Sequence, residues 1–598
     1  MHFPRLVLRP LPVLFVMLTV FRAPAQTAVS NVVILIEATP LASLVRPGPE
    51  PLRDIPGLML RQQGASAPQG DLSIRGSPFN GAGLLLNGLT LRNAQTEHWH
   101  ADLSVPNIWT DTPTVLTGME RFRAASGHPS GSVSLELAPL SETLRSITLG
   151  GGDKGALFGQ AVFTETEPFR DGVAGASAFV SADRADQTDG YRDNDLVRGA
   201  AGARIHAANE TMRSDLVTAL SWREFGARGF YGTDPSFPAA ERKGDALAAG
   251  SLRFVQDPRQ PARLSAAWLR TRDTYWLDRH NRTFYENDHT TDFFVAHGDT
   301  RRTFNDTVSV DLRADGDLET LESRSLGNHT RSHASLAVLP NLTCGPLTWT
   351  VGGALDLFST DSPIPLPAAG VEWTVSERHT LFLSYTAAAR QPSYTELNYE
   401  SPSSLGNAGL DRQRTQTAEL GWKAEHGPFR WRTVLFHEEG RNIVDWRRTS
   451  PAGRWQAVNL ETLRTTGLAA EGVWEVDGNT DFGLNLLTVS KDTDTSGYAS
   501  RYALDYPRAA ADACVRHRLT RELSLRLSQG VSRYATNHAR QHDNWFWDTR
   551  AGVQWQPRQL PGLTLNAGID NLLDDDFQIF PGQETAGRCM YVSLTHVW

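Results

Sequence analysis

The sequence Asn571-Leu-Leu-Asp-Asp-Asp-Phe577, followed by Gly587-Arg-Cys-Met-Tyr-Val-Ser-Leu-Thr-His-Val-Trp598, predicts a loop that leads into the last strand of a membrane β-barrel. One face of that strand carries Met590, Val592, Leu594 and Trp598, with His596 as its polar residue, and the other face carries Tyr591, Ser593 and Thr595. This alternation with period 2 is typical of a strand between lipid and a wet lumen. In a soluble protein such a terminal strand would expose an apolar edge, which closure into a barrel removes.

The first 25 residues predict a secretory signal peptide. Arg5 and Arg9 precede an apolar run from Leu11 to Phe21, and Ala23-Pro24-Ala25 supplies small residues for cleavage. The run is shorter than the ~20 residues that a spanning helix needs, and no later run is longer and equally apolar. We therefore expect an exported mature chain that begins at Gln26 and enters a membrane only as a barrel.

The composition agrees with a barrel and excludes other classes. The chain of 598 residues is only 40% hydrophobic yet contains 50 Gly, 25 Phe and 16 Trp, as strands that alternate between lipid and lumen require. A net charge of −9 without a basic stripe argues against a nucleic-acid partner. The widely separated Cys344, Cys514 and Cys589 suit neither a disulfide framework nor a metal cluster.

Period 2 recurs along the chain from about residue 141. Leu523, Leu525 and Leu527, for example, alternate with Ser524, Arg526 and Ser528. This region can supply roughly two dozen strands of the ~9–11 residues that a tilted transmembrane strand needs. That number is close to the about 22 strands of the largest transporter barrels.

The region before the barrel has a different character. It begins with a β-prone run, Val32, Val33, Ile34, Leu35 and Ile36, and continues into a stretch containing Pro47, Pro49 and Pro51. Such an extended run is suited to adding as an edge strand to the sheet of a partner protein. An ordinary first strand of the following domain is the alternative.

Several short motifs then resemble one family. They are Ile55-Pro56-Gly57, Asp71-Leu-Ser-Ile-Arg-Gly76, Leu84-Leu-Leu-Asn-Gly88, Asp102-Leu-Ser-Val-Pro106, Tyr385-Thr-Ala-Ala-Ala-Arg390, Glu419-Leu-Gly421 and the terminal strand. Together they resemble TonB-dependent outer-membrane receptors over about residues 31–598. The resemblance implies a signal peptide (1–25), a TonB-interacting segment and linker (26–48), an α/β plug domain (49–140) and a transmembrane β-barrel of about 22 antiparallel strands around the plug (141–598).

The resemblance extends to finer features. Leu84–Leu86 suits a buried strand and Asn87-Gly88 a tight turn, although Asp is more usual than Asn87 in the family. Ala418, Leu420 and Trp422 should face lipid. Asn459, Gly467 and Glu471 match positions of the family's following strands, and the regions 225–231 and 279–289 resemble a subgroup that includes cobalamin-type receptors.

The resemblance implies a function as well as a fold. We expect a monomer in the outer membrane of a Gram-negative-type bacterium, surrounded by outer-membrane lipid, that imports a scarce solute with energy from a TonB-type partner protein bound to Val32–Ile36. A passive porin is one alternative, but it would lack the plug. A barrel enzyme is the other, but the sequence contains no G-x-S-x-G, no H-E-x-x-H and no phosphate-binding glycine loop.

The ligand is expected on two outward plug loops. By resemblance these loops include Phe79 and Asn80, and then Gln95, Thr96, His98, Trp99 and His100. The second loop offers neutral donors, acceptors and an indole but no cluster of Arg or Lys, so it favours a bulky amide-rich cobalamin over an anionic ferric siderophore, which is the alternative. His98 and His100 could share a metal, but polar loop residues are the favoured interpretation because a third ligand is lacking.

An acidic run offers a second metal hypothesis. Asp183, Asp186, Asp189, Asp193 and Asp195 present hard oxygen ligands at loop spacing, which suits calcium. The spacing does not match an EF-hand, so a solvated acidic loop is favoured. No cofactor is required by any part of this interpretation.

Overall fold

The computed structural model describes residues 52–53, 55–63, 68–97, 103–186, 193–232, 236–257, 259–450, 453–494, 498–537, 540, 543–581 and 587–598. These residues belong to one unit that spans residues 33–598. Within the described ranges, no helix is long and apolar enough to cross a membrane.

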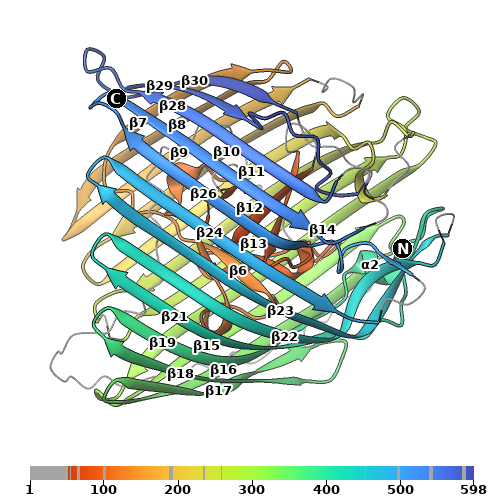
Figure 1. Ribbon diagram of the computed structural model, residues 1–598, viewed down its shortest axis with the longest axis horizontal. Helices are drawn as coiled ribbons and strands as arrows, with labels where there is room; N and C mark the ends of the chain where they lie inside the picture. The colour runs from red at the N-terminus through yellow and green to blue at the C-terminus, as the bar shows by residue number, and fades with distance from the viewer. Residues whose placement is uncertain are drawn as a thin grey trace, which may run out of the picture. The chain divides into compact units, whose positions relative to one another are not determined.

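A closed antiparallel barrel of 22 long strands forms most of this unit, as the sequence predicted (Figure 1). Its strands are β7 (Leu144–Gly152), β8 (Leu157–Phe169), β9 (Gly172–Ala185), β10 (Leu196–Ala208), β11 (Met212–Gly226), β12 (Ala240–Phe254), β13 (Ala262–Trp276), β14 (Glu286–Thr303), β15 (Val308–Ser323), β16 (His329–Cys344), β17 (Leu347–Phe358), β18 (Ile364–Ser376), β19 (His379–Arg390), β21 (Gln413–His426), β22 (Phe429–Arg448), β23 (Trp455–Asp477), β24 (Thr480–Asp492), β26 (Pro507–Arg518), β27 (Leu523–Tyr534), β28 (Trp545–Trp555), β29 (Leu563–Asp570) and β30 (Cys589–Val597). The loops between them contain the short strands β20 (Ser404–Leu405) and β25 (Ala499–Ser500), the helix α2 (Tyr394–Asn398) and the 3-10 turn η5 (Phe230–Gly232).

The terminal strand closes the barrel. In β30, Leu594 pairs with Leu149 of β7, and the last residue exchanges two backbone hydrogen bonds with Arg145, of 3.0 and 3.2 Å. Met590 and Val592 are more than half exposed on the outside, whereas Ser593 is buried inside. The predicted alternation of this strand is therefore confirmed, and every strand in the wall has two neighbours.

The two ends of the barrel differ in the length of their connections. Turns at one end are tight, for example those that join Cys344 to Leu347 and Ser376 to His379. At the other end, 22 residues separate Arg390 from Gln413, and long loops also follow β24, β27 and β29. Because outer-membrane barrels carry short periplasmic turns and long external loops, the long-loop end faces outward.

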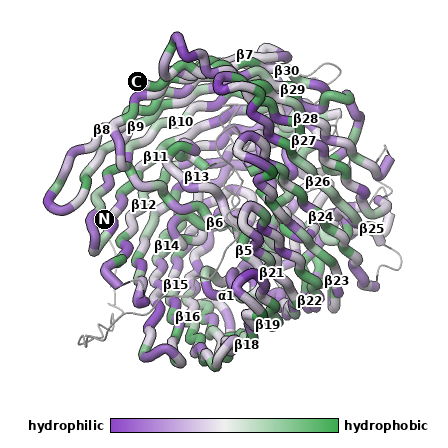
Figure 2. Tube along the Cα trace, turned by 60° about the vertical axis from the view of Figure 1, so that its left-hand side comes forward, coloured by the Kyte–Doolittle hydropathy of each residue, from purple (hydrophilic) through white to green (hydrophobic). Residues whose placement is uncertain are grey.

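The outer surface of the barrel is apolar and ends in an aromatic ring. Hydrophobic and hydrophilic residues alternate along most strands (Figure 2). Near the short turns, exposed aromatic residues lie around the wall: Phe169, Phe254, Phe304, Trp349, Trp373, Trp422, Trp474, Trp555 and Trp598. Such a ring marks the level of the inner lipid headgroups. Leu420 and Trp422 both face outward, as predicted.

Small sheets and one helix fill the lumen (Figure 1). We call this region the plug. Its elements are β1 (Leu58–Gln63) and β2 (Gln69–Ile74), which form a hairpin, the 3-10 turns η3 (Phe79–Gly81) and η4 (Asn107–Trp109), the helix α1 (Gly118–Ala124), and a second sheet with the order β4 (Leu89–Leu91), β3 (Ala82–Leu86), β6 (Gly131–Leu135) and β5 (Thr114–Leu116).

The turn between β3 and β4 has the predicted form. Leu84–Leu86 are buried, and both Asn87 and Gly88 adopt positive φ, of 48° and 80°. A Cβ at Gly88 would come within 2.8 Å of Arg263 and His297 of the barrel wall, so the turn requires glycine for space as well as for conformation. Asn87 accepts a hydrogen bond from the Leu137 backbone and donates one to Ser251, each of 2.8 Å.

One side of the plug is attached to the barrel by an apolar core. Leu84, Val133 and Trp109 of the plug pack in one cluster with residues from β8, β9 and β11 to β14, including Phe179 and Phe293. Trp109 also meets Phe179 edge to face at 5.1 Å. The wall from β8 to β14 is therefore the apolar seat of the plug.

Candidate functional site

Helix α2, in the long loop after β19, joins both outward plug loops. Asn80 donates to Glu396 at 3.2 Å, and the backbone carbonyl of Gln95 accepts from the backbone and hydroxyl of Thr395, at 3.0 and 2.8 Å. Ser393 begins the helix with a capping box in which Glu396 is the return partner. The external loop and the two predicted ligand loops therefore form one connected surface.

The second plug loop is neutral in its outward part because its charges are paired below. Arg92 contacts Glu97 at 2.9 Å and Asp317 at 2.7 Å, and Arg331 donates to the other oxygen of Glu97 at 2.7 Å. Burial by itself would lower the pKa of Arg92, but the attraction of the Asp317 and Glu97 carboxylates is larger, and the pKa of Arg92 is raised. In the described part of this loop, Gln95 and Thr96 are polar residues that are partly exposed.

The structure describes only some of the predicted ligand residues. Phe79, Asn80, Gln95 and Thr96 lie in the connected surface at the outward end. His98, Trp99 and His100 lie outside the described residues, as do the coupling residues Val32–Ile36. The ligand and coupling roles of all these residues stay predictions.

A cluster of aromatic and arginine side chains adjoins the first plug loop. Phe79 meets Tyr502 edge to face at 5.1 Å, and the guanidinium of Arg501 lies 5.0 Å from the Tyr502 ring and 5.7 Å from the Trp455 ring. Arg448 covers the same Trp455 at 4.5 Å. A neighbouring pair, Arg447 over Tyr498 at 5.6 Å, completes what we call the mouth cluster: Tyr498, Tyr502, Trp455, Arg447, Arg448 and Arg501.

The mouth cluster is cationic. No carboxylate in the described part of the chain forms an ion pair with Arg447 or Arg501, and Asp445 is instead bonded to Ser500 and to the backbone of Tyr502. Burial raises the pKa of both Tyr498 and Tyr502, so their hydroxyls stay protonated donors. The arrangement can hold an anion and stack on a flat ring.

Sequence reasoning missed the mouth cluster. Its members come from two barrel connections, one between β22 and β23 and one between β24 and β26, and each residue alone is ordinary for such a position. One signal was present: arginine stands next to an aromatic residue at Trp446-Arg447, Arg454-Trp455 and Arg501-Tyr502.

The acidic loop is only partly described. Asp195 accepts two hydrogen bonds from Arg279, and Asp193 lies within 4 Å of Arg279, Arg228 and His280. Burial by itself would raise the pKa of Asp195, but the hydrogen bond and the positive charge of Arg279 have the larger effect, so the pKa of Asp195 is lowered. Asp186 is exposed and Asp189 lies outside the described residues, so the calcium hypothesis stays a prediction.

Charged pairs also join the plug to β21 of the wall. Arg75 of the plug contacts Glu419 at 2.5 Å, and Lys423 contacts Glu120 of α1 at 2.9 Å. Gly118, at φ 50°, begins α1 so close to Glu419 that a Cβ would overlap its carboxylate. These contacts lie on β21, on the side away from the apolar seat.

The outward tip of the plug hairpin is tied to external loops. Arg61 of β1 contacts Asp505 at 2.9 Å, and Arg540 contacts the other oxygen of Asp505, also at 2.9 Å. All three side chains are at least 95% buried. On the other side of the tip, Gln69 and Glu241 both bond the hydroxyl of Tyr231. We call the Arg61, Asp505 and Arg540 group the clasp.

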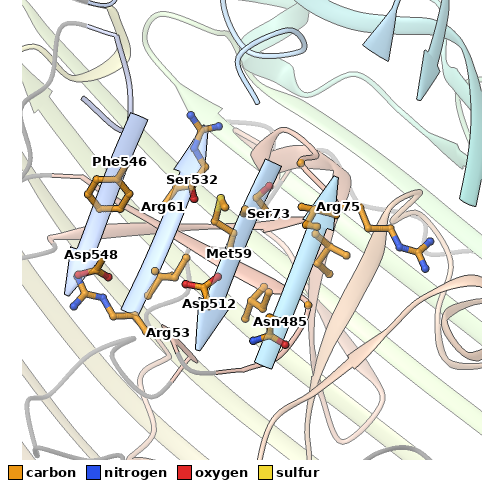
Figure 3. A pocket seen from close by; sticks show the side chains of 18 of the residues that line it. Arg53, Met59, Arg61, Ser73, Arg75, Asn485, Asp512, Ser532, Phe546 and Asp548 are labelled. Carbon is orange, nitrogen blue, oxygen red and sulfur yellow. The ribbon is translucent and has the colours of Figure 1, made fainter. Parts of the chain in front are cut away.

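A cavity of about 190 Å³ separates the hairpin from the wall formed by β22 to β28. Figure 3 shows Met59, Arg61, Ser73 and Arg75 of the plug beside Asn485, Asp512, Ser532 and Asp548 of the wall strands. Polar and charged groups line it from both sides. We call this cavity the polar seam: charged groups line it together with apolar residues such as Leu60 and Val434, whereas the seat across the lumen is apolar throughout. Water can hydrate the charged groups of the seam.

A lipid-facing barrel, a plug that fills it and a polar surface at its outward mouth define an outer-membrane receptor. The profile of the family described as TonB dependent receptor-like, beta-barrel, matches residues 145–572, and the chain belongs to this family. It is therefore an outer-membrane protein of Gram-negative bacteria, and its family consists of transport receptors rather than enzymes.

Solved structures share the fold over nearly the whole chain. The siderophore receptor PirA from Pseudomonas aeruginosa is 18% identical, with 92% of this chain and 96% of that chain covered and a TM-score of 0.70. A point mutant of the ferric enterobactin receptor PfeA from the same organism is 15% identical, with coverage of 92% and 95% and a TM-score of 0.74. The FrpB iron transporter from Neisseria meningitidis is 13% identical, with coverage of 92% and 96% and a TM-score of 0.73. No curated protein sequence matches the chain.

Proposed function

We propose that the protein binds a scarce solute at its outward mouth and imports it into the periplasm with energy supplied through a TonB-type partner. The plug fills the lumen and is fixed on both sides, by the apolar seat and by buried ion pairs. Passive passage would require those contacts to open, so work must come from outside the barrel. The partner would add a strand to Val32–Ile36 and pull, as in β-augmentation.

The observation that carries the ligand class is the mouth cluster. Its arginines Arg447 and Arg501 present positive charge without paired carboxylates in the described residues, and its rings provide flat apolar surfaces. A ferric siderophore of the catecholate type is an anion with aromatic rings, so it matches both properties through charge-assisted bonds and stacking. We therefore favour a ferric siderophore as the transported ligand.

Cobalamin is the second candidate, because one observation favours it. The described part of the second plug loop presents neutral groups, since Arg92 and Glu97 neutralise each other below it. A bulky amide-rich corrinoid needs neutral donors and acceptors. The two candidates differ in charge, which makes them separable.

A binding experiment distinguishes them. The purified receptor is titrated with a ferric tris-catecholate and with cyanocobalamin while tryptophan fluorescence is recorded. We expect saturable binding of the catecholate, weakened roughly tenfold or more in R447Q/R501Q, because a hydrogen bond to a charged group contributes about 1.5–3 kcal/mol. Arg441 is the matched control, since it is exposed on the same strand but already paired with Glu439 at 3.0 Å.

Three outcomes would contradict parts of the proposal. Tight cyanocobalamin binding that R447Q/R501Q leaves unchanged would move the ligand to the second plug loop. An equal loss of catecholate affinity in R441Q would show that the surface charge in general, and not the mouth cluster, attracts the ligand. Uptake that persists when the proton gradient is collapsed would refute energy coupling.

A further inference from the structure

An open groove of about 1060 Å³ crosses the lipid-facing side of β8 to β13. These strands lie side by side in the wall (Figure 2). The outward positions on its floor are small: Gly159, Ala182, Gly199, Ala201, Gly244 and Ala246. Small residues on adjacent strands lower the surface locally and leave room for a guest.

Large apolar side chains stand beside this floor. Leu157 and Val180 rise on one side, and Leu220 and Trp222 of β11 rise across it, all of them more than half exposed. The indole of Trp222 lies over Gly199, because a Cβ there would be 3.0 Å from the indole nitrogen. The floor and its walls therefore have the apolar character needed to hold hydrocarbon chains.

Arginines line the same groove. Arg184 and Arg272 are exposed and point outward, and neither forms an ion pair with a carboxylate in the described stretches of the chain. Arg270, by contrast, forms an ion pair with Asp292 at 3.6 Å. Arg184 is next to the last residue of β9, and Arg272 lies in the final third of β13. Both strands run toward the long external loops, so these guanidinium groups lie at the outer side of the membrane.

An unpaired guanidinium on a lipid-facing surface needs an anion. Arg on the lipid face of a barrel costs about 2–4 kcal/mol at the bilayer midplane and less toward the interfaces, and an anionic lipid headgroup removes that cost. Phosphate is the anion that the planar fork of arginine matches best. The anion must also be attached to hydrocarbon, because the rest of the groove is apolar.

We propose that this groove is a binding site for a phosphorylated, multiply acylated glycolipid of the outer leaflet. Its phosphates bind Arg184 and Arg272, and its acyl chains lie over the floor between Val180 and Leu220. The site is independent of the transported ligand, since it is on the opposite face of the wall from the lumen. It would fix specific lipids to one side of the barrel.

The barrel carries an internal comparison. A second outer groove of about 890 Å³ lies over β26 to β30 and β7, with Ala551 and Ala567 as small outward residues of its floor. The arginine that lines it, Arg526, bonds to Ser528, which is buried toward the lumen. This groove should take any acyl chain without preference for phosphate.

Native mass spectrometry of the full-length protein, refolded free of lipid and kept in detergent, tests the proposal. The probes are bis-phosphorylated lipid A, dephosphorylated lipid A and inorganic phosphate. Wild type should retain the bis-phosphorylated lipid, and R184Q/R272Q should bind it roughly tenfold or more weakly, as expected for lost charge-assisted bonds. R242Q is the matched control, because Arg242 is outward on β12 but already pairs with Glu224 at 2.5 Å.

A separate variant tests the apolar floor of the groove. A201F keeps every arginine and fills the floor, so it should also weaken lipid binding. Unchanged binding in R184Q/R272Q, or equal binding of dephosphorylated lipid A, would overturn the phosphate assignment. Inorganic phosphate binding as tightly as the lipid, or full binding by A201F, would overturn the acyl-chain assignment. If R184Q/R272Q does not fold, the dephosphorylated probe and A201F still decide the outcome.

Discussion

Replacing Asp505 by Asn should loosen the plug hairpin from the external loops. Asp505 is the carboxylate that pairs with both Arg61 and Arg540, and the side chains are 2%, 5% and 0% exposed, respectively. D505N preserves the shape but removes the counter-charge that the two buried guanidinium groups share. Removing one partner of a buried ion pair costs about 3–5 kcal/mol.

The assay is the conductance of single barrels in a planar bilayer as urea is raised. The plug fills the lumen, so its unfolding appears as a large new pore while the barrel wall persists. A domain of this size loses about 1–2 kcal/mol of stability per molar urea, so D505N should lower the opening midpoint by roughly 1.5–5 M.

The control removes a pair of the same type from the surface. Arg145 and Glu165 are 46% and 59% exposed, and exposed pairs contribute about 0.2–1 kcal/mol, so E165Q should shift the midpoint by at most about 1 M. A midpoint in D505N that matches wild type, or equal shifts in the two variants, would show that the clasp does not hold the plug.

Three further predictions concern coupling, assembly and pH. V33P or L35P should abolish uptake and leave ligand binding intact, because proline removes the backbone donor needed for strand addition; normal uptake would place the coupling segment elsewhere. Deleting Trp598 should lower the amount of heat-modifiable folded barrel, because its backbone exchanges two hydrogen bonds with Arg145 at the closure; unchanged abundance would contradict this. Burial, together with nearby arginines, lowers the pKa of His128 to about 3, below the unfolded value of about 6.5. Because the unfolded chain then binds a proton that the folded chain does not, the free energy of unfolding is unaffected by His128 above pH ~6.5 and decreases as the pH falls from there toward 3. The urea midpoint of pore opening should therefore fall more steeply below pH ~6.5 in wild type than in H128Q, and parallel curves would refute that.

Much of the fold could be predicted because its signals are local. Period 2 in the terminal strand, from Met590 to Trp598, fixes which face meets lipid, and Asn87-Gly88 is a turn in almost any context. The mouth cluster could not be predicted in the same way. Trp455 and Tyr502 pack in one cluster only after β22 to β26 take their register, and no local sequence pattern encodes that contact.

The same reasoning bears on the predicted ligand. The preference for cobalamin relied on the absence of an arginine or lysine cluster within the plug loop Asn93–His100. In the folded chain the arginines next to the plug come from barrel loops, as Arg501 does beside Phe79 through Tyr502. Charge around a binding mouth is a property of several loops together, so the composition of one loop is a weak guide to ligand charge.

The contrast between the apolar seat and the polar seam has a mechanical consequence. Under a pulling load, water can replace each hydrogen bond that breaks along the seam, so little free energy is lost there once the first contacts part. No such replacement exists for the seat, where every Å² of newly wetted apolar surface costs about 25 cal/mol. For equal areas of contact, separating hydrogen-bonded groups of the seam therefore costs less free energy than separating the apolar cluster around Trp109 and Phe293.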